Sequence, residues 1–379
     1  MTRSATERPR LSRSFLRIQQ IAPGGMMYLP DQCLNVLTSQ YMARGMRAMV
    51  VGAGSMAGCA LLRSLESAGC PRVVGTLDRA IAHHAPQRQD GIRLEVLESR
   101  HGAEVRRMFF REKPTHVFLA SSGPCIGDGR DTVAQFLQRS LATQVNVLQA
   151  AFEAGVERLV LVGAANSTPA HVAPTPGRKT RPAGPPAAWV EARFSAVIKG
   201  GKLCECYNRH HGTRFATVIA PEVYGPGACI DASGVVHHFM QRFLEARTSS
   251  PNCVVLKHAP GARHELLHVD DLAAACLLVM SLSEADLQPG PSETGDGLRF
   301  DAGSGRQVGG FELARLVADV AGYDGKVIFD VPREQEPRPS LLDASRLNSL
   351  GWLPQVELRE GLAAMRDWRL THCRTASRN

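Results

Sequence analysis

A short apolar run, a glycine turn and a helical pattern follow one another at residues 47–69, and this stretch limits the fold more than any other. The run RAMVVG (47–52) is typical of a buried strand, and the apolar spacing of MAGCALLRSLESAG predicts a helix directly after it. Glycines at such a junction allow a sharp turn and a close approach of the backbone. The stretch therefore predicts the first strand–turn–helix unit of a parallel α/β sheet.

The same alternation of β-rich runs and amphipathic stretches continues to about residue 220. Beyond residue 224 the pattern is looser, with helical spacing in FELARLVADVAGY and ELREGLAAMRDWRL. We therefore predict an α/β fold, a doubly wound parallel Rossmann sheet with a smaller C-terminal α/β lobe. The predicted strands after the first are 72–77, 92–97, 115–120, 158–163 and 214–220.

Charge and composition exclude several classes of protein. The formal net charge is +8, but residues 1–47 carry +5 of it, with seven arginines against two acids. The rest of the chain has no basic stripe interleaved with aromatics, so no nucleic-acid partner is expected. No apolar run approaches the roughly 18–20 residues of a membrane span. The ten cysteines form no C-x-x-C pair, which favours reduced thiols and no metal site.

The glycine turn has the composition of a nucleotide site. Gly52, Gly54 and Gly58 give the pattern G-x-G-x-x-x-G, with Ser55 and Met56 inside it. Glycine lets the backbone approach a pyrophosphate, whose charge then lies at the N-terminus of the following helix. We therefore predict that these five residues contribute to binding a dinucleotide.

Two residues at the end of the second predicted strand bear on the choice of cofactor. Asp78 follows Gly58 by twenty residues and is suited to hold the adenosine ribose hydroxyls of NAD. Arg79 beside it is suited instead to meet the 2′-phosphate of NADP. The sequence does not decide whether the cofactor is NAD or NADP.

By the fifth predicted strand the order of segments resembles that of a known family. The segments are EKPTHVFLAS, QVNVLQAAFEAGVERLVLVG, KLCECYNRHHG, APEVYGPG, HELLHVDDLAAAC and LLDASRLNSLGW. They resemble the extended short-chain dehydrogenase/reductases (the NAD-dependent epimerase/dehydratase family), most closely the GDP-L-fucose synthase branch. The similarity runs from about Arg47 to Leu370. It implies a domain that binds NADPH and a lobe that binds GDP-4-keto-6-deoxymannose, which such enzymes epimerise at C3 and C5 and reduce at C4.

The resemblance also adds two residues to the cofactor site. Glu98 stands where a family acid commonly meets the adenine, and Ala120 ends the fourth predicted strand. Ser55 stands where the family has the middle glycine of its turn. The extra Cβ of Ser55 departs from the family pattern at the point where the pyrophosphate approaches.

The family's catalytic residues are replaced at the positions that match them. Where the family has Ser-Ser-Cys after the fifth strand, this chain has Ala164, Ala165 and Asn166. Without gaps, Arg193 falls at the position of the catalytic tyrosine and Val197 at that of its lysine partner. The resemblance thus implies a site that has lost its hydroxyl, thiol, phenol and ammonium groups.

Other residues lie near the remaining catalytic positions of the family without matching them. Gly234 takes the place of the family's second acid/base histidine, with His237 and His238 further along the predicted helix. Ser195 and Lys199 have the i, i+4 spacing of the tyrosine–lysine pair, but using them requires a two-residue deletion. A rotation of about 200° then separates them from the family's packing face.

Substrate contacts are retained in part. Arg242 matches a family arginine that meets the nucleotide diphosphate. His264 takes the place of another arginine, with Arg263 adjacent to it, and Lys257 replaces a pocket tryptophan. Arg242, Arg263 and His264 are therefore the predicted substrate residues.

The sequence divides the chain into three parts. Residues 1–46 form a basic extension, either a tail or an organelle transit peptide. Residues 47–223 form the NAD(P)-binding Rossmann domain, with a Pro-rich loop at 169–186. Residues 224–379 form the C-terminal substrate lobe, interleaved with the sheet. A cytoplasmic location is expected, with a mitochondrion or plastid as the alternative if the extension is a transit peptide.

Three hypotheses about function follow. In the first, the chain is a catalytically degenerate pseudoenzyme that binds NAD(P) or a nucleotide sugar. Such a chain would form a homodimer, a heterodimer with an active homologue or a subunit of a larger assembly, using the predicted helices 132–154 and 188–212. In the second, it is an active nucleotide-sugar reductase or epimerase that uses Ser195, Lys199 or Asn166 in changed roles. In the third, it is a structural subunit without a bound nucleotide.

Overall fold

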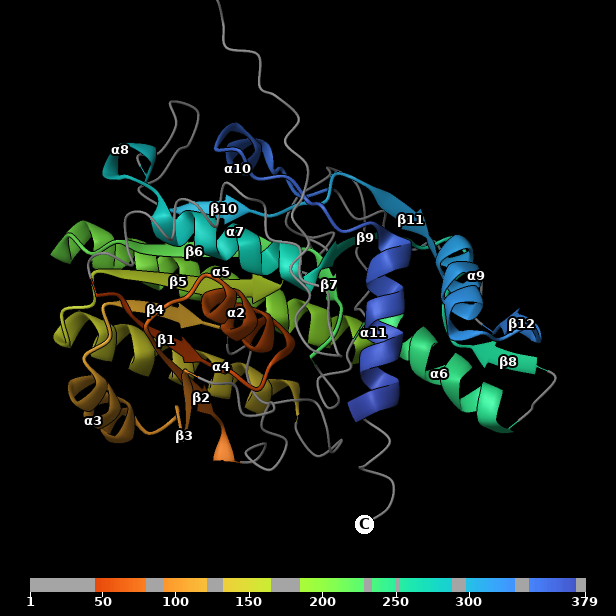
Figure 1. The fold of residues 1–379 in the computed structure, drawn as a ribbon, viewed down its shortest axis with the longest axis horizontal. Coiled ribbons are helices and arrows are strands. Elements are labelled where there is room, and N and C mark those ends of the chain that lie inside the picture. The colour runs from red at the N-terminus through yellow and green to blue at the C-terminus, as the bar shows by residue number, and fades with distance from the viewer. Residues whose placement is uncertain are drawn as a thin grey trace, which may run out of the picture.

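A seven-stranded parallel sheet forms the centre of the computed structural model, with helices on both faces (Figure 1). The structure describes residues 45–79, 91–120, 132–164, 185–227, 234–249, 253–287, 298–330 and 341–372. The strand order β10-β6-β5-β4-β1-β2-β3 starts in the middle and winds outward in both directions, which confirms the predicted doubly wound sheet. Its strands are β1 (Arg47–Val51), β2 (Arg72–Leu77), β3 (Ile92–Val96), β4 (His116–Leu119), β5 (Arg158–Ala164), β6 (Phe215–Ala220) and β10 (Arg299–Asp301).

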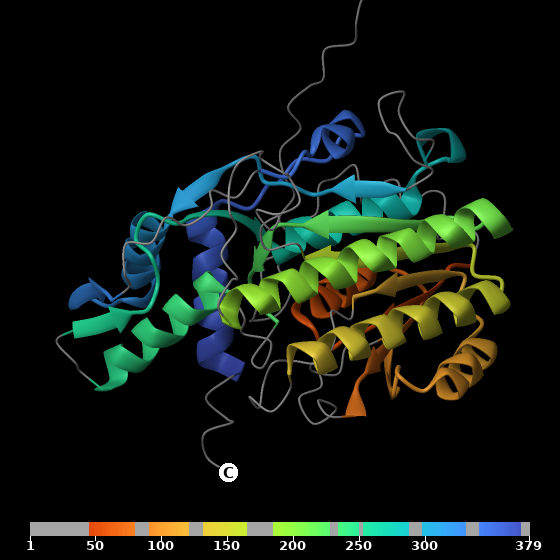
Figure 2. The same cartoon turned by 180° about the vertical axis from the view of Figure 1, so that it is seen from behind.

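The inner strands of the sheet are mostly apolar because both of their faces are buried. Along β1, Val50 faces one core and its neighbour Met49 faces the other, since side chains alternate between the faces of a strand. The helices α4 (Val133–Glu153) and α5 (Pro185–His211) lie side by side across one face (Figure 2). The covering helices are α2 (Met56–Ser67) and α7 (Val269–Ser281) on one face, and α3 (Gly102–Glu112), α4 (Val133–Glu153) and α5 (Pro185–His211) on the other.

A second hydrophobic core lies at one end of the sheet (Figure 1). Phe239 and Phe243 contribute to it from α6 (Val235–Ser249), Val317 from α9 (Gly310–Ala321) and Met365 from α11 (Leu358–His372). The lobe is interleaved with the large sheet, because β10 and α7 follow residue 224 in the chain and pack with the first part. The elements of the lobe are β7 (Glu222–Tyr224), α6 (Val235–Ser249), β8 (Cys253–Leu256), β9 (Arg263–His268), β11 (Gln307–Gly309), α9 (Gly310–Ala321), β12 (Lys326–Phe329) and α11 (Leu358–His372). The short helices α8 (Glu284–Leu287) and α10 (Ser345–Ser349) instead pack with the core of the large sheet, through Leu287 and Leu347.

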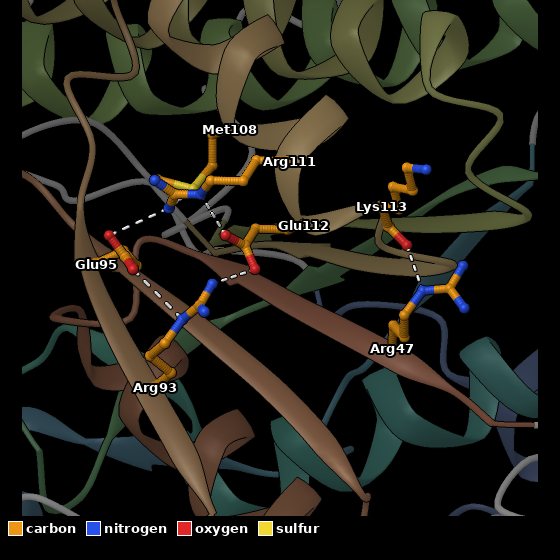
Figure 3. A network of polar contacts seen from close by, with 7 residues as sticks. All are labelled: Arg47, Arg93, Glu95, Met108, Arg111, Glu112 and Lys113. Atoms are coloured by element: carbon orange, nitrogen blue, oxygen red, sulfur yellow. Dashed lines mark hydrogen bonds and ion pairs between the residues drawn. The ribbon is translucent and has the colours of Figure 1, made fainter.

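Ion pairs connect α3 to the edge strand β3 (Figure 3). Arg93 pairs with Glu112 and with Glu95, the latter at 3.3 Å between Nε and Oε1. Arg111 pairs with Glu95 at 3.2 Å and with Glu112 at 2.6 Å. Each exposed pair adds little stability, but a charged edge strand resists pairing with another chain.

Several predicted segments lie outside the described residues. These are residues 1–44 of the basic extension and residues 169–184 of the Pro-rich loop. The last two loop residues, Pro185 and Pro186, instead begin α5, where proline is well tolerated because the first amides of a helix have no partner. Within the described ranges, no helix has both the length and the hydropathy needed to cross a membrane.

Candidate nucleotide-binding site

The glycine turn after β1 has the geometry that its residues predict. Gly52 has a φ of +86°, in the left-handed region that favours glycine. A Cβ on Gly58 would lie 2.1 Å from the carbonyl oxygen of Gly52, so α2 approaches β1 this closely only without a side chain there. The turn places the N-terminus of α2 at the carboxyl end of β1, where doubly wound sheets hold a pyrophosphate.

Ser55 forms hydrogen bonds inside this turn. It is the N-cap of α2, and its hydroxyl accepts a hydrogen bond from the Gly58 amide at 3.0 Å. The hydroxyl also lies 2.8 Å from the Gly52 carbonyl and 3.0 Å from the Ala120 carbonyl, either of which can accept its proton. Ser55 thus joins the turn to the end of β4 in addition to its predicted place beside the cofactor.

The other predicted cofactor residues lie along the same edge of the sheet. Asp78 and Arg79 directly follow β2, Glu98 lies two residues past β3, and Ala120 directly follows β4. The Ala120 amide donates to the Val51 carbonyl at 2.9 Å, which holds the ends of β4 and β1 together. The structure therefore brings these residues to one edge, as the sequence predicts for parallel strands.

Glu98 already has a partner at this edge. Arg100 donates to both of its carboxylate oxygens, at 2.6 Å from Nε and 2.8 Å from Nη2. These hydrogen bonds hold the pKa of the Glu98 carboxyl below its usual range. The contact of Glu98 with an adenine stays a prediction, and Arg100 is a residue of this edge that sequence reasoning missed.

An apolar contact lies at the carboxyl end of β5, where the resemblance places the catalytic lysine. Val197 of α5 packs so tightly on Gly163 that a Cβ on the glycine would lie 2.4 Å from a valine methyl carbon. Val197 is 9% exposed and clusters with Ile219 and Leu342. None of these side chains can donate or accept a proton, and a charge buried among them would cost about 5 kcal/mol.

The alternative pair of Ser195 and Lys199 points elsewhere. α5 is one continuous helix, and each of the two residues is two positions from Val197, which is about 200° of rotation. Lys199 is exposed and Ser195 is half-buried. The structure therefore does not bring this pair to the end of β5. Arg193, at the tyrosine position, has its guanidinium carbon 6.0 Å from the centre of the Phe136 ring of α4.

A carboxylate and two imidazoles form a chain in the small lobe. Nε2 of His264 lies 2.8 Å from Nε2 of His258, and its Nδ1 lies 3.5 Å from Oε2 of Glu222. The other Glu222 oxygen accepts from the Val235 amide at 2.5 Å, at the first residue of α6. Burial, reinforced by His264, lowers the pKa of His258 to about 4, so it is neutral at pH 7. Sequence reasoning singled out His264 but missed its partners, which lie on separate segments.

The Glu222 carboxylate lies beside Gly234, the residue that stands where the family has its second acid/base histidine. Gly234 has a φ of +145°, and a Cβ on it would lie 2.6 Å from Oε1 of Glu222. His237, one turn on, is 1% exposed, and neither of its ring nitrogens has a hydrogen-bond partner among the described residues. Burial lowers the pKa of His237 to about 4. Neither His237 nor the exposed His238 takes the lost position.

The predicted cationic substrate residues lie on the surface of the small lobe. Arg242 on α6 and Arg263 on β9 are both exposed. The Arg263 guanidinium donates to the side-chain and backbone oxygens of Gln307 at 3.2 Å and 3.3 Å. Asn166 lies outside the described residues. Within the described ranges, no group of three or more His, Cys, Asp or Glu side chains could hold a metal ion.

Comparisons with known proteins agree with this architecture. A family model described as the NAD dependent epimerase/dehydratase family matches residues 48–292. GDP-L-fucose synthase 1 of Arabidopsis thaliana is 31% identical over 331 residues, which cover 86% of this chain and 93% of that protein.

Two solved structures with bound cofactors share the fold. The NADP-bound GDP-mannoheptose C4 reductase of Campylobacter jejuni superposes with a TM-score of 0.65 at 23% identity, covering 86% of this chain and 99% of that one. The NAD complex of Thermus thermophilus UDP-glucose 4-epimerase has a TM-score of 0.64 at 21% identity, covering 86% and 99%. The fold is therefore one that binds nicotinamide dinucleotides.

Proposed function

Because the chain belongs to the NAD-dependent epimerase/dehydratase family, we propose that it binds a nicotinamide dinucleotide but does not catalyse the reaction of its GDP-L-fucose synthase relatives. The observation that carries this proposal is Val197, seated on Gly163 where the resemblance implies a lysine. Without that ammonium group and its tyrosine, nothing in this cluster protonates the alkoxide formed when a ketone is reduced.

Neither Tyr207 nor Tyr224 replaces the missing acid. Tyr207 lies ten residues past Val197 on α5, about 15 Å along the helix axis, and donates to Gln149 at 2.5 Å. Tyr224 is 2% exposed, and burial raises the pKa of its hydroxyl further. A general acid contributes roughly 10²–10⁴ in rate, and several such groups are replaced together.

The preferred cofactor under this proposal is NAD rather than NADP. Asp78 is the first residue after β2 and stands beside the glycine turn, since the Ala53 amide donates to the Thr76 carbonyl at 2.8 Å. A carboxylate there accepts hydrogen bonds from ribose hydroxyls and repels a 2′-phosphate. Arg79 follows it and is exposed.

We further propose that the chain acts through a partner, as a homodimer or as a heterodimer with an active homologue. The supporting feature is the broad surface of α4 and α5, which lie side by side on one face (Figure 2) and leave Val145 47% exposed. Light scattering on the purified protein tests this, and a monomer at all concentrations would count against the homodimer.

The experiment that tests the proposed function takes two readings from one sample. NADH binding is followed by fluorescence titration, and oxidation is followed at 340 nm with GDP-4-keto-6-deoxymannose. An active GDP-L-fucose synthase serves as the positive control. We expect saturable binding without oxidation above the protein-free rate. Turnover within about a thousandfold of the control would refute the loss of chemistry, and absence of binding would refute the nucleotide site.

A further inference from the structure

Two buried polar groups of the small lobe have no hydrogen-bond partner among the described residues. They are the two ring nitrogens of His237 on α6 and the Nη1 atom of Arg369 on α11. Both helices contribute to the core of the lobe (Figure 1). We infer that Arg369 and His237 form a binding site for a small inorganic anion, such as chloride, between α6 and α11. This site does not depend on the proposed function.

The spacing of residues on α11 explains why Arg369 turns toward the interior. Gly361, Met365 and Arg369 follow one another at intervals of four and therefore lie on one face of the helix. Met365 is fully buried, and a Cβ on Gly361 would lie 2.7 Å from Cδ2 of His268, so this face packs inward. The Nη1 atom of Arg369 is buried, whereas the residue as a whole is half-buried. The side chain thus connects the interior with the surface.

His237 faces the interior from the amino-terminal end of α6. It is the third residue of the helix, and its side chain is buried. After burial, the charge of Arg369 is the next largest cause that lowers the pKa of the His237 imidazole, so the two groups lie near each other. Glu222 opposes this shift, but its carboxylate already accepts from the Val235 amide. A neutral imidazole at this place offers one N–H donor to a ligand.

An anion satisfies these two groups better than a water molecule does. A guanidinium keeps its charge and has only donors, so a buried arm without a partner requires an acceptor. Burial lowers the pKa of Arg369, which indicates that its charge is poorly solvated. Glu245 offsets this in part from the exposed side of α6, where its carboxylate accepts from Gln241 at 2.8 Å. Water accepts the same donors but does not balance the charge.

Thermal denaturation of the full-length protein in chloride tests the inference. Sodium chloride replaces sodium gluconate at a constant ionic strength of about 0.2 M, so that screening stays the same. Gluconate is too large to enter a site enclosed by two packed helices. We expect chloride to raise the midpoint by about 2 °C or more, because a ligand that binds only the folded state stabilises it. An unchanged midpoint would overturn the inference.

Three variants locate the effect in the structure. Arg369→Met removes the guanidinium but keeps a long apolar stem, so the rise in chloride should vanish. His237→Leu should reduce the rise by about half or more, since one of the two donors is lost. The control Arg359→Met, exposed on the same helix and paired with Asp319 at 2.6 Å, should keep the full rise. A rise in Arg369→Met equal to that of the parent would mean an adventitious ion only and would overturn the assignment.

A crystal of the unmodified protein grown in sodium bromide locates the ion without any substitution. We expect an anomalous difference peak within about 3.5 Å of both Nη1 of Arg369 and a ring nitrogen of His237. A water molecule at this place, or bromide on the surface alone, would overturn the inference.

Discussion

Gly58 is the residue on which the shape of the nucleotide turn depends most directly. Gly58→Ala places a Cβ 2.1 Å from a backbone oxygen, so α2 must move away from β1. We expect a loss of about 2–3 kcal/mol in the free energy of unfolding, as for other overpacked sites, and weaker nucleotide binding. Urea denaturation measures the first effect. Gly261→Ala, with nothing within 4 Å of its Cβ, is the control and should change stability far less.

Lys113 is the one non-glycine residue with a positive φ among those described, at 47°. It follows the last turn of α3, and its carbonyl accepts a hydrogen bond from Nε of Arg47 at 2.5 Å (Figure 3). Lys113→Gly keeps that carbonyl and removes the strain of a left-handed residue, so we expect a gain of about 0.5–1 kcal/mol. Lys199→Gly, within a helix, should instead lose about 1 kcal/mol. Thermal denaturation measures both variants. If Lys113→Gly and Lys199→Gly changed stability equally, the backbone of Lys113 would not be strained.

Residue-level reasoning from the sequence was most informative where backbone geometry leaves little choice. The glycines between a predicted strand and a predicted helix indicated the turn, and the structure shows why glycine is needed at Gly52 and Gly58. The ungapped alignment places Val197 at the lysine position, and the structure adds its contact with Gly163. The roles of Ser55 and Glu98 were harder to foresee, since their partners Ala120 and Arg100 are evident only from the folded structure.

At the scale of elements, one buried carboxylate connects three segments of the chain. Glu265 of β9 is 6% exposed and accepts from the backbone amides of Ser304 at 2.7 Å, Gly305 at 3.2 Å and Leu342 at 2.9 Å. Glu265→Gln turns an NH2 group toward an amide donor, so we expect a loss of about 2–3 kcal/mol. Urea midpoints measure it, with the exposed Glu360→Gln as the control. A loss as small as that of the control would mean that the carboxylate does not organise these segments.

The strands of the large sheet were predictable because each depends on local pattern. All six predicted strands agree with the structure to within one residue at either end. β10 was not foreseen, since its three residues carry no pattern and join the sheet only by pairing with β6. The chain of Glu222, His264 and His258 was hidden for the same reason, because its members meet through tertiary packing.

For the whole molecule, buried histidines make stability depend on pH. Burial lowers the pKa of both His116 and His237 to about 4, from an ordinary value near 6.5. As pH falls from 6.5 towards 4, the unfolded chain takes up these protons before the folded one does. Stability is therefore full above pH 6.5 and declines below it, by about 2 kcal/mol per histidine at pH 5.

The variant His237→Leu isolates one of these contributions, because the ring nitrogens of His237 have no hydrogen-bond partner in the described structure. Urea denaturation at pH 7.5 and at pH 5 measures the decline. We expect the variant to lose about 2 kcal/mol less than the parent protein between the two values. Equal losses would mean that His237 is not protonated on unfolding.

We propose that the molecule keeps a nucleotide-binding fold while an apolar contact of Val197 with Gly163 replaces the family's catalytic lysine. A crystal structure of the protein with NAD tests this most directly. We predict an ordered adenosine diphosphate at the N-terminus of α2, ribose hydroxyls on Asp78, and Val197 still packed on Gly163. We also predict that no proton-donating side chain lies within about 3.5 Å of the nicotinamide ring. An ordered nicotinamide with such a donor over the end of β5 would contradict the account.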